Sequence, residues 1–238
     1  MPDHAVNGAA DAAPTEPAGW FGKLACLGDF ASRRLPPEFT QACDAWLSRG
    51  IEASRARLGA RWLDVYLTSP LWRYAWAPGV LDARWWFGVL MPSVDNVGRY
   101  FPLLIAQPCN EAPHRTEDLD RLERWFTQLA QAALATLQPG ATLERFESEL
   151  ASAPAWPSPT PPLAWAEAQW PDRMHHPMPS GVTLAQDLQR LGAFETLQRF
   201  RSCTLWWPLR PGNSDSGLSV AVGLPAAESF AQLLEGAW

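Results

Sequence analysis

A short segment in the first half of the chain places residue types that could do chemistry close together. Residues 89–103 read VLMPSVDNVGRYFPL, so Ser93, Asp95, Gly98 and Arg99 lie between two apolar runs. A hairpin connection needs only about two turn residues. The additional polar groups make this segment a candidate for a catalytic site, a binding site or an elaborate structural turn.

The spacing of the reactive residue types supports no catalytic site. Ser93 lacks the G-x-S-x-G context of a hydrolase nucleophile, and no histidine lies in a segment predicted to be structured around it. His175 and His176 are adjacent, and adjacent residues seldom chelate one ion. Glycine-rich phosphate motifs are absent from the sequence, and the spacing selects no pair of aspartates for acid–base work. We therefore predict no catalytic, cofactor-binding or metal-binding residues.

Local backbone chemistry explains each polar residue of the segment. Asp95 and Asn96 turn the chain by accepting backbone N–H bonds, and Gly98 adopts a positive φ. Arg99 then pairs with an acid near the sheet, either Asp95 or Asp29. Such a half-buried pair fixes the shape of a loop at little net gain in stability. A shaped, charged loop beside a sheet edge is either a purely structural turn or a docking site, and the residues alone leave both open.

Apolar runs bounded by turn residues predict the strands that position this segment. The first begins at Trp20 and ends in a turn at Gly28 and Asp29, and two more flank the polar segment itself. The predicted strands lie within residues 20–30, 71–76, 84–93, 99–108, 203–209 and 218–224.

Apolar residues at helical spacing, together with end signals, predict the helices. Pro36 and Pro37 fit the first turn of the first helix and Gly59 its end, whereas Thr116 is the predicted N-cap of the most regular one. The predicted helical ranges are 35–61, 62–67, 116–138, 142–150, 184–191 and a final segment opened by Pro225.

This order of elements predicts an α+β fold, an α/β sandwich with a largely antiparallel central sheet packed by helices, because several strands follow one another too closely for crossovers. We predict that residues 1–18 form a disordered Ala/Pro-rich leader and that residues 19–238 form a single domain. Residues 151–180 are predicted to form a Pro/Trp-rich loop, whose three tryptophans indicate that it packs on the domain. They are Trp156, Trp165 and Trp170.

Composition excludes several classes of protein. The net charge of −6 disfavours a nucleic-acid partner, which requires a basic face. No apolar run is long enough to insert in a membrane, and the start lacks the features of a secretory signal. The four cysteines are widely spaced, as in reduced thiols of a cytoplasmic protein. We therefore expect a cytoplasmic protein.

Three ordered blocks of sequence resemble the TagF (ImpM-like) family of bacterial type VI secretion. GWFGKLACLGDF at residues 19–30 is similar to the opening pattern of that family, although the family commonly has a proline in the region of Ala25, Cys26 and Leu27. WLDVYLTSPLWRYAWAPG and GVLMPSVDNVGRYFPL are similar to two further blocks, and CTLWWP loosely to a later one.

The resemblance implies a non-enzymatic regulator. TagF proteins are cytoplasmic, post-translational repressors of type VI secretion assembly that act on a forkhead-associated (FHA) scaffold protein. They function beside a threonine kinase that promotes assembly and a phosphatase that reverses it. The expected partner is therefore the FHA-domain scaffold, and the family offers no catalytic residues to carry over.

The positions matching the family motifs are the candidate partner-binding residues: Trp20, Lys23, Gly28, Asp29, Phe30, Ser93, Asp95, Gly98 and Arg99. We expect the two turns that carry them to meet at one end of the sheet through an Asp–Arg contact, with Trp20 and Phe30 at the edge of the resulting surface. Two alternatives remain. One is an enzyme or sensor that binds a phosphorylated or nucleotide-like ligand through Arg99 and Lys23; the other is a structural accessory subunit of the secretion apparatus.

Overall fold

A computed structural model describes residues 16–156, 181–209 and 217–238. Most of the predicted leader and of the Pro/Trp-rich loop, including Trp165, Trp170 and both histidines of the 175–176 pair, lies outside the described residues.

Within the described residues, seven strands form one sheet in the order β2-β1-β5-β4-β3-β6-β7. Every pairing between them is antiparallel, which confirms the predicted fold class. The short edge strand β2 was not predicted, because its three residues carry no apolar pattern. The strands are β1 (Gly19–Gly22), β2 (Ala31–Arg33), β3 (Leu71–Trp76), β4 (Trp85–Met91), β5 (Leu103–Cys109), β6 (Cys203–Leu209) and β7 (Ser219–Val222).

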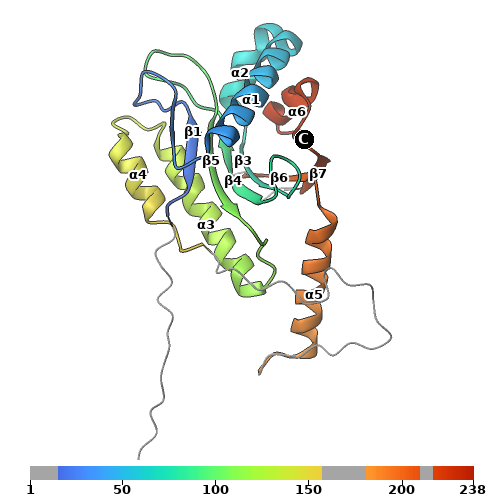
Figure 1. The fold of residues 1–238 in the computed structure, drawn as a ribbon. Helices are drawn as coiled ribbons and strands as arrows, with labels where there is room; N and C mark the ends of the chain where they lie inside the picture. Colours follow the sequence, from blue (N-terminus) through green and yellow to red (C-terminus); the bar gives the residue numbers. More distant parts are fainter. Residues whose placement is uncertain (1–15, 157–180, 210–216) are drawn as a thin grey trace, which may run out of the picture.

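Helices cover both faces of the sheet, as Figure 1 shows. One face packs against α1, α2 and α6, and the other against α3 and α4. The helices are α1 (Pro37–Leu58), α2 (Trp62–Thr68), α3 (Thr116–Ala135), α4 (Leu143–Ala151), α5 (Leu184–Arg199) and α6 (Phe230–Glu235), with short 3₁₀ turns η1 (Gly59–Arg61) and η2 (Ala227–Ser229).

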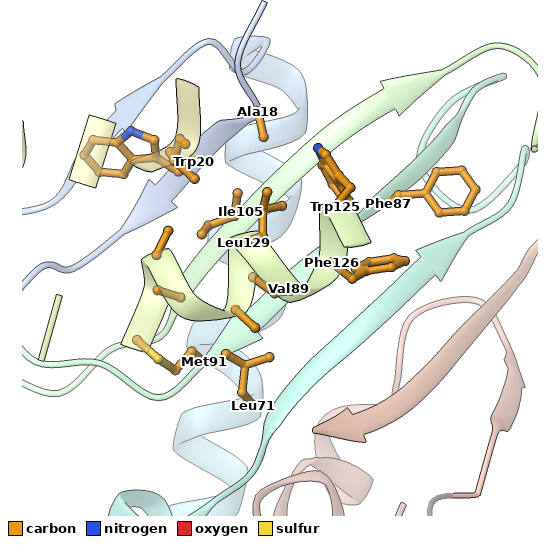
Figure 2. Packing of buried hydrophobic residues seen from close by; sticks show 14 of the residues in the cluster. Ala18, Trp20, Leu71, Phe87, Val89, Met91, Ile105, Trp125, Phe126 and Leu129 are labelled. Atoms are coloured by element: carbon orange, nitrogen blue, oxygen red, sulfur yellow. The ribbon is translucent and has the colours of Figure 1, made fainter. Parts of the chain in front are cut away.

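The core has two halves because side chains alternate across the strands. On the α3 face, Val89 and Ile105 of the central strands meet Phe126 and Leu129 of the helix (Figure 2). The α1 face holds a dense aromatic cluster in which Trp46, Trp76 and Trp206 lie within 6 Å of one another by ring centroids. Aromatic rings in such edge and tilted contacts bury large apolar areas.

The ends of three elements differ from the sequence prediction. Helix α3 begins at Thr116, so its N-cap is Arg115 and the expected capping role of Thr116 is wrong. Helix α5 continues to Arg199, well past the predicted end at residue 191, because Gly192 has open space and does not stop it. Strand β5 begins only at Leu103, because the residues before it are held by the turn described below.

Two further expectations concern the loop and membranes. Trp156, the described tryptophan of the Pro/Trp-rich loop, packs on Phe87 and Trp125, as expected for that residue. Within the described ranges, no helix combines the length and apolarity that crossing a membrane would require.

Candidate functional site

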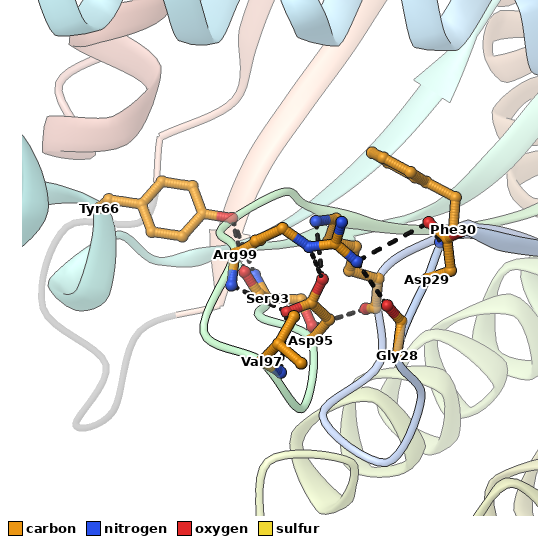
Figure 3. Close-up of polar contacts among 9 residues, drawn as sticks. Gly28, Asp29, Phe30, Tyr66, Ser93, Asp95, Val97 and Arg99 are labelled. Carbon is orange, nitrogen blue, oxygen red and sulfur yellow. Dashed lines mark hydrogen bonds and ion pairs between the residues drawn. The ribbon is translucent and has the colours of Figure 1, made fainter.

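Strand pairing brings the two candidate turns together. Gly22 at the end of β1 pairs with Leu103 at the start of β5, and Leu103 pairs with Met91 at the end of β4. The turn after β1 and the connection from β4 to β5 therefore leave the sheet at the same end. Figure 3 shows part of the resulting contacts. We call the residues that make up the two turns' contacts the two-turn cluster: Lys23, Gly28, Asp29, Phe30, Ser93, Asp95, Val97, Gly98 and Arg99.

The buried carboxylate of Asp95 is the centre of this cluster. Its Oδ2 accepts hydrogen bonds from Lys23 Nζ at 2.8 Å and from Arg99 Nε at 2.7 Å. Its Oδ1 accepts the backbone N–H groups of Val97 at 3.1 Å and of Arg99 at 2.8 Å. The side chain of Asp95 is fully shielded from solvent, and that of Lys23 is 5% exposed. One acid therefore satisfies two cations and two backbone donors.

Hydrogen bonding decides the ionisation state of this acid. Burial of the carboxyl group by itself would raise the pKa of Asp95. The bonds from the Lys23 ammonium and from the backbone and side chain of Arg99 outweigh burial and hold that pKa below its usual range. Asp95 is thus a structural anion at neutral pH and not a proton donor or acceptor poised for catalysis.

Four further contacts join the first turn to the second. Ser93 Oγ donates to the carbonyl of Lys23 at 2.7 Å, and the N–H of Asn96 donates to the carbonyl of Leu27 at 2.9 Å. Arg99 Nη2 donates to the carbonyl of Gly28 and lies 3.9 Å from Asp29 Oδ1. The structure thus brings the turns together as expected, and Arg99 meets both of the acids that the sequence left open.

Tyr66 of α2 also supports the cluster, and sequence reasoning missed it. Its hydroxyl donates to the carbonyl of Ser93 at 2.9 Å and accepts the N–H of Ser93 at 3.0 Å. The hydroxyl is buried, and burial raises the pKa of Tyr66 well above its ordinary value. No local signal marks a tyrosine 27 residues away as a partner of this turn.

The glycines of the cluster have different roles. Gly98 has φ +83° and its N–H donates to the carbonyl of Asp95 at 3.1 Å, so it supplies the left-handed residue that closes the loop. Gly28 lies against Asn96, where an added Cβ would stand 3.3 Å from the amide oxygen. Gly28 therefore lets the first turn approach the second closely.

The outer side of the cluster is exposed and mixed in character. The exposed fraction is 46% for Phe30 and 66% for Val97, and the charged side chains of Asp29 and Arg99 are also exposed. The Phe30 ring packs edge-on against Phe101, with a 4.7 Å distance between ring centroids, so its orientation is fixed although it faces solvent. We call Asp29, Phe30, Val97 and Arg99 the two-turn surface.

Part of the expected surface is buried. Trp20 lies on the α4 side of β1, is fully buried against Phe146, and donates its Nε1–H to Glu147 at 2.7 Å. The expectation that Trp20 edges the surface is therefore wrong, because alternation along β1 turns it into the core. Lys23 and Ser93 are buried as well and hold the turns from inside.

Two kinds of small ligand, a metal ion and an anion, can be compared with the described side chains. Among the described residues, no group of three histidine, cysteine or acidic side chains could hold a metal ion. The alternative anion site requires Lys23 and Arg99 to be available. Both cations donate to the single carboxylate of Asp95, so their charge is already partly balanced within the chain.

The chain is similar to known proteins over most of its length. A family model described as the TagF N-terminal domain, type VI secretion system-associated, matches residues 19–153, a range that includes both turns. The chain is also similar to the crystal structure of PA0076 from Pseudomonas aeruginosa PAO1. The two share 40% sequence identity with a TM-score of 0.70, and the match covers 92% of this chain and 94% of that chain. No curated protein sequence matches.

Proposed function

The chain belongs to the TagF family of type VI secretion system-associated proteins, and we propose that it is a non-enzymatic, cytoplasmic, post-translational repressor of type VI secretion assembly. It acts by binding the FHA-domain scaffold protein through the two-turn surface. Its place is beside the threonine kinase and phosphatase that control the same assembly step.

The observation that carries this proposal is that buried residues of the two-turn cluster fix the turns and exposed ones form a surface. The buried residues fix the two turns through Asp95, while the outer residues present an oriented aromatic ring beside an acid and an arginine. Aromatic and arginine side chains are the types that most often carry the binding energy of protein interfaces. A rigid surface also loses little conformational entropy on binding.

The structure gives less support to the alternative of a phosphorylated or nucleotide-like ligand. An anion site needs cations with unmatched charge and free hydrogen-bond donors. Lys23 is buried against Asp95, and Arg99 donates to Asp95 and to the carbonyl of Gly28 with Asp29 close by. A docking surface for protein suits this charge-balanced arrangement better.

Replacing Val97 with arginine is expected to weaken binding of the FHA-domain scaffold at least tenfold, a loss of about 1.4 kcal/mol of binding free energy. The Val97 side chain is 66% exposed and only its backbone takes part in the cluster, so the variant changes the surface while leaving the fold intact. The measurement is isothermal titration of the purified full chain with the purified scaffold.

A matched control is available on β7. Val222 is 84% exposed on a strand far from the two turns in the sheet order, so Val222→Arg makes the same chemical change elsewhere. Scaffold affinity that is equal for wild type and Val97→Arg, with Val222→Arg also unchanged, would move the binding site away from the two-turn surface.

A further inference from the structure

The two edges of the sheet differ in how well they are protected from pairing with another chain. Strand β2 forms one edge, where the Arg33 side chain is 48% exposed and its Nη1 lies 3.4 Å from Glu147 Oε1. Strand β7 forms the other edge, on the far side of the sheet from β1 in Figure 1. Charges and prolines on an edge strand discourage pairing with a further strand, and β7, which reads SVAV, has neither.

The hydrogen bonds between β6 and β7 show which backbone groups of β7 point outward. The N–H of Gly223, directly after β7, donates to the carbonyl of Ser202 at 2.7 Å. Bonded and non-bonded residue pairs alternate along two antiparallel strands. Val222 therefore directs its N–H and C=O away from β6, and so does Val220, two residues earlier. Within the described part of the chain, no strand pairs with these outward groups.

The side chains of the same two valines are also exposed. The exposed fraction is 46% for Val220 and 84% for Val222. The register with β6 places Val220 opposite Leu205, a core residue of the α3 face, so both valines project from that face. The outer edge of β7 thus offers backbone donors and acceptors beside two apolar side chains, which is the arrangement that an added β-strand covers.

The sequence of β7 defines which strand fits this edge. Its last three residues read VAV, the same in both directions about Ala221. When a second copy approaches antiparallel with Ala221 opposite Ala221, Val220 of each copy lies opposite Val222 of the other. Each of these pairs exchanges two backbone hydrogen bonds, and its β-branched side chains contact each other across the strands. A single arrangement therefore satisfies the outward backbone groups of both copies and covers the exposed valines of both.

Charge and symmetry also favour a second copy over an unrelated strand. Residues 216–226 contain no charged side chain, so a two-fold axis at Ala221 brings no like charges into opposition. Pairing of one patch with itself closes after two copies, because the edge of each copy is then used. The second copy carries the complementary strand in its own sequence.

We propose that two copies of the chain associate through β7, paired antiparallel about Ala221, so that their sheets become continuous. The residues that carry this association lie outside the two-turn cluster, and each copy keeps its own two-turn surface. The inference therefore stands or fails independently of scaffold binding at the two turns.

Cysteine cross-linking of the full chain tests the register of this pairing. The two Ala221 residues would form a non-bonded pair with a Cα–Cα distance of about 4.5 Å, which a disulfide can span. Ala221→Cys is therefore expected to give a covalent dimer on oxidation with diamide, and peptide mass spectrometry identifies the link at position 221. In Val220→Cys the two new cysteines lie diagonally, about 7–8 Å apart, and are expected to give at least tenfold less dimer.

Sedimentation equilibrium of the full chain tests the association without a cross-link. The interface is small, so the measurement extends to about 1 mM chain. Val222→Arg places an arginine opposite Val220 of the second copy and is expected to weaken self-association at least tenfold. Leu67→Arg makes a similar change at a 59% exposed leucine of α2 and is expected to leave self-association unchanged.

Three results would overturn this inference. A chain that stays monomeric over the whole concentration range would leave the β7 edge to a strand of another protein. Equal amounts of covalent dimer from Ala221→Cys and Val220→Cys, or none from either, would contradict the register. A wild-type dimer that Val222→Arg does not weaken would place the contact between copies elsewhere.

Discussion

Replacing Asp95 with alanine is expected to lower the midpoint of thermal unfolding by about 10 °C at neutral pH. The substitution leaves the Lys23 ammonium buried without its partner and removes the acceptor for Arg99 and two backbone N–H groups. Removing one partner of a buried ion pair is strongly destabilising. In a chain of this length, each kcal/mol of lost unfolding free energy lowers the midpoint by a few degrees. Calorimetry of both proteins measures the difference.

The destabilisation caused by Asp95→Ala should become smaller as the pH falls. Because the folded protein holds the pKa of Asp95 below its ordinary value, the carboxylate stabilises the fold above the unfolded pKa, about 4. That contribution is lost as the pH falls further, towards the folded pKa. The gap between wild type and Asp95→Ala is therefore expected to be constant above about pH 5 and to narrow in more acidic solution.

A second substitution separates the effect of the unpaired buried charge on stability from the effect of lost packing. Adding Lys23→Met to Asp95→Ala removes the unpaired ammonium and should recover part of the lost stability, because deleting both partners costs less than deleting one. Glu149→Ala, which breaks the exposed Arg145–Glu149 pair on α4, serves as the control and should change the midpoint by only a degree or two. An Asp95→Ala midpoint as close to wild type as this control would show that the carboxylate does not hold the turns.

Replacing Gly88 with alanine is expected to destabilise the protein by about 3 kcal/mol, at the upper end of the cost of overpacking a core. An added Cβ would stand 1.9 Å from the carbonyl oxygen of Ile105 and 2.6 Å from the hydroxyl of Tyr74. That hydroxyl donates to the same carbonyl at 3.0 Å, across β4. The new methyl group would displace a fully buried ring and leave its hydroxyl without an acceptor.

Gly192 provides the matched control for this substitution. It lies inside α5 with open space around it, so Gly192→Ala should stabilise the helix slightly because alanine is the better helix former. Urea unfolding of wild type and of the two variants measures the change in the free energy of unfolding. Equal stability of Gly88→Ala and wild type would show that β3, β4 and β5 do not require a glycine at their centre.

Local signals in the sequence were sufficient for most elements of this fold. Pro37 at the start of α1 and Gly59 after its end mark a helix of 22 residues whose apolar spacing is also regular. Strand β2 escaped prediction because it is three residues long and owes its conformation to pairing with β1. The length of α5 was missed because a glycine in a helix is tolerated where nothing else opposes it.

The candidate site was predictable only in its local part. The turn made by Asp95, the positive φ of Gly98 and the pairing of Arg99 with an acid follow from residues close in sequence. Lys23 reaches Asp95 across 72 positions, and Tyr66 reaches Ser93 across 27, so only the assembled sheet shows these contacts. Such pairings depend on strand order, which no local pattern specifies.

The most direct measurement is photo-cross-linking in bacteria that produce the secretion system. A photoreactive amino acid replaces Val97 in one strain and Val222 in another, and adducts are identified after irradiation. An adduct with the FHA-domain scaffold from position 97 and none from position 222 is the predicted result, because Val97 lies on the two-turn surface and Val222 on β7. A scaffold adduct from position 222 alone, or none from position 97, would contradict binding through the two turns.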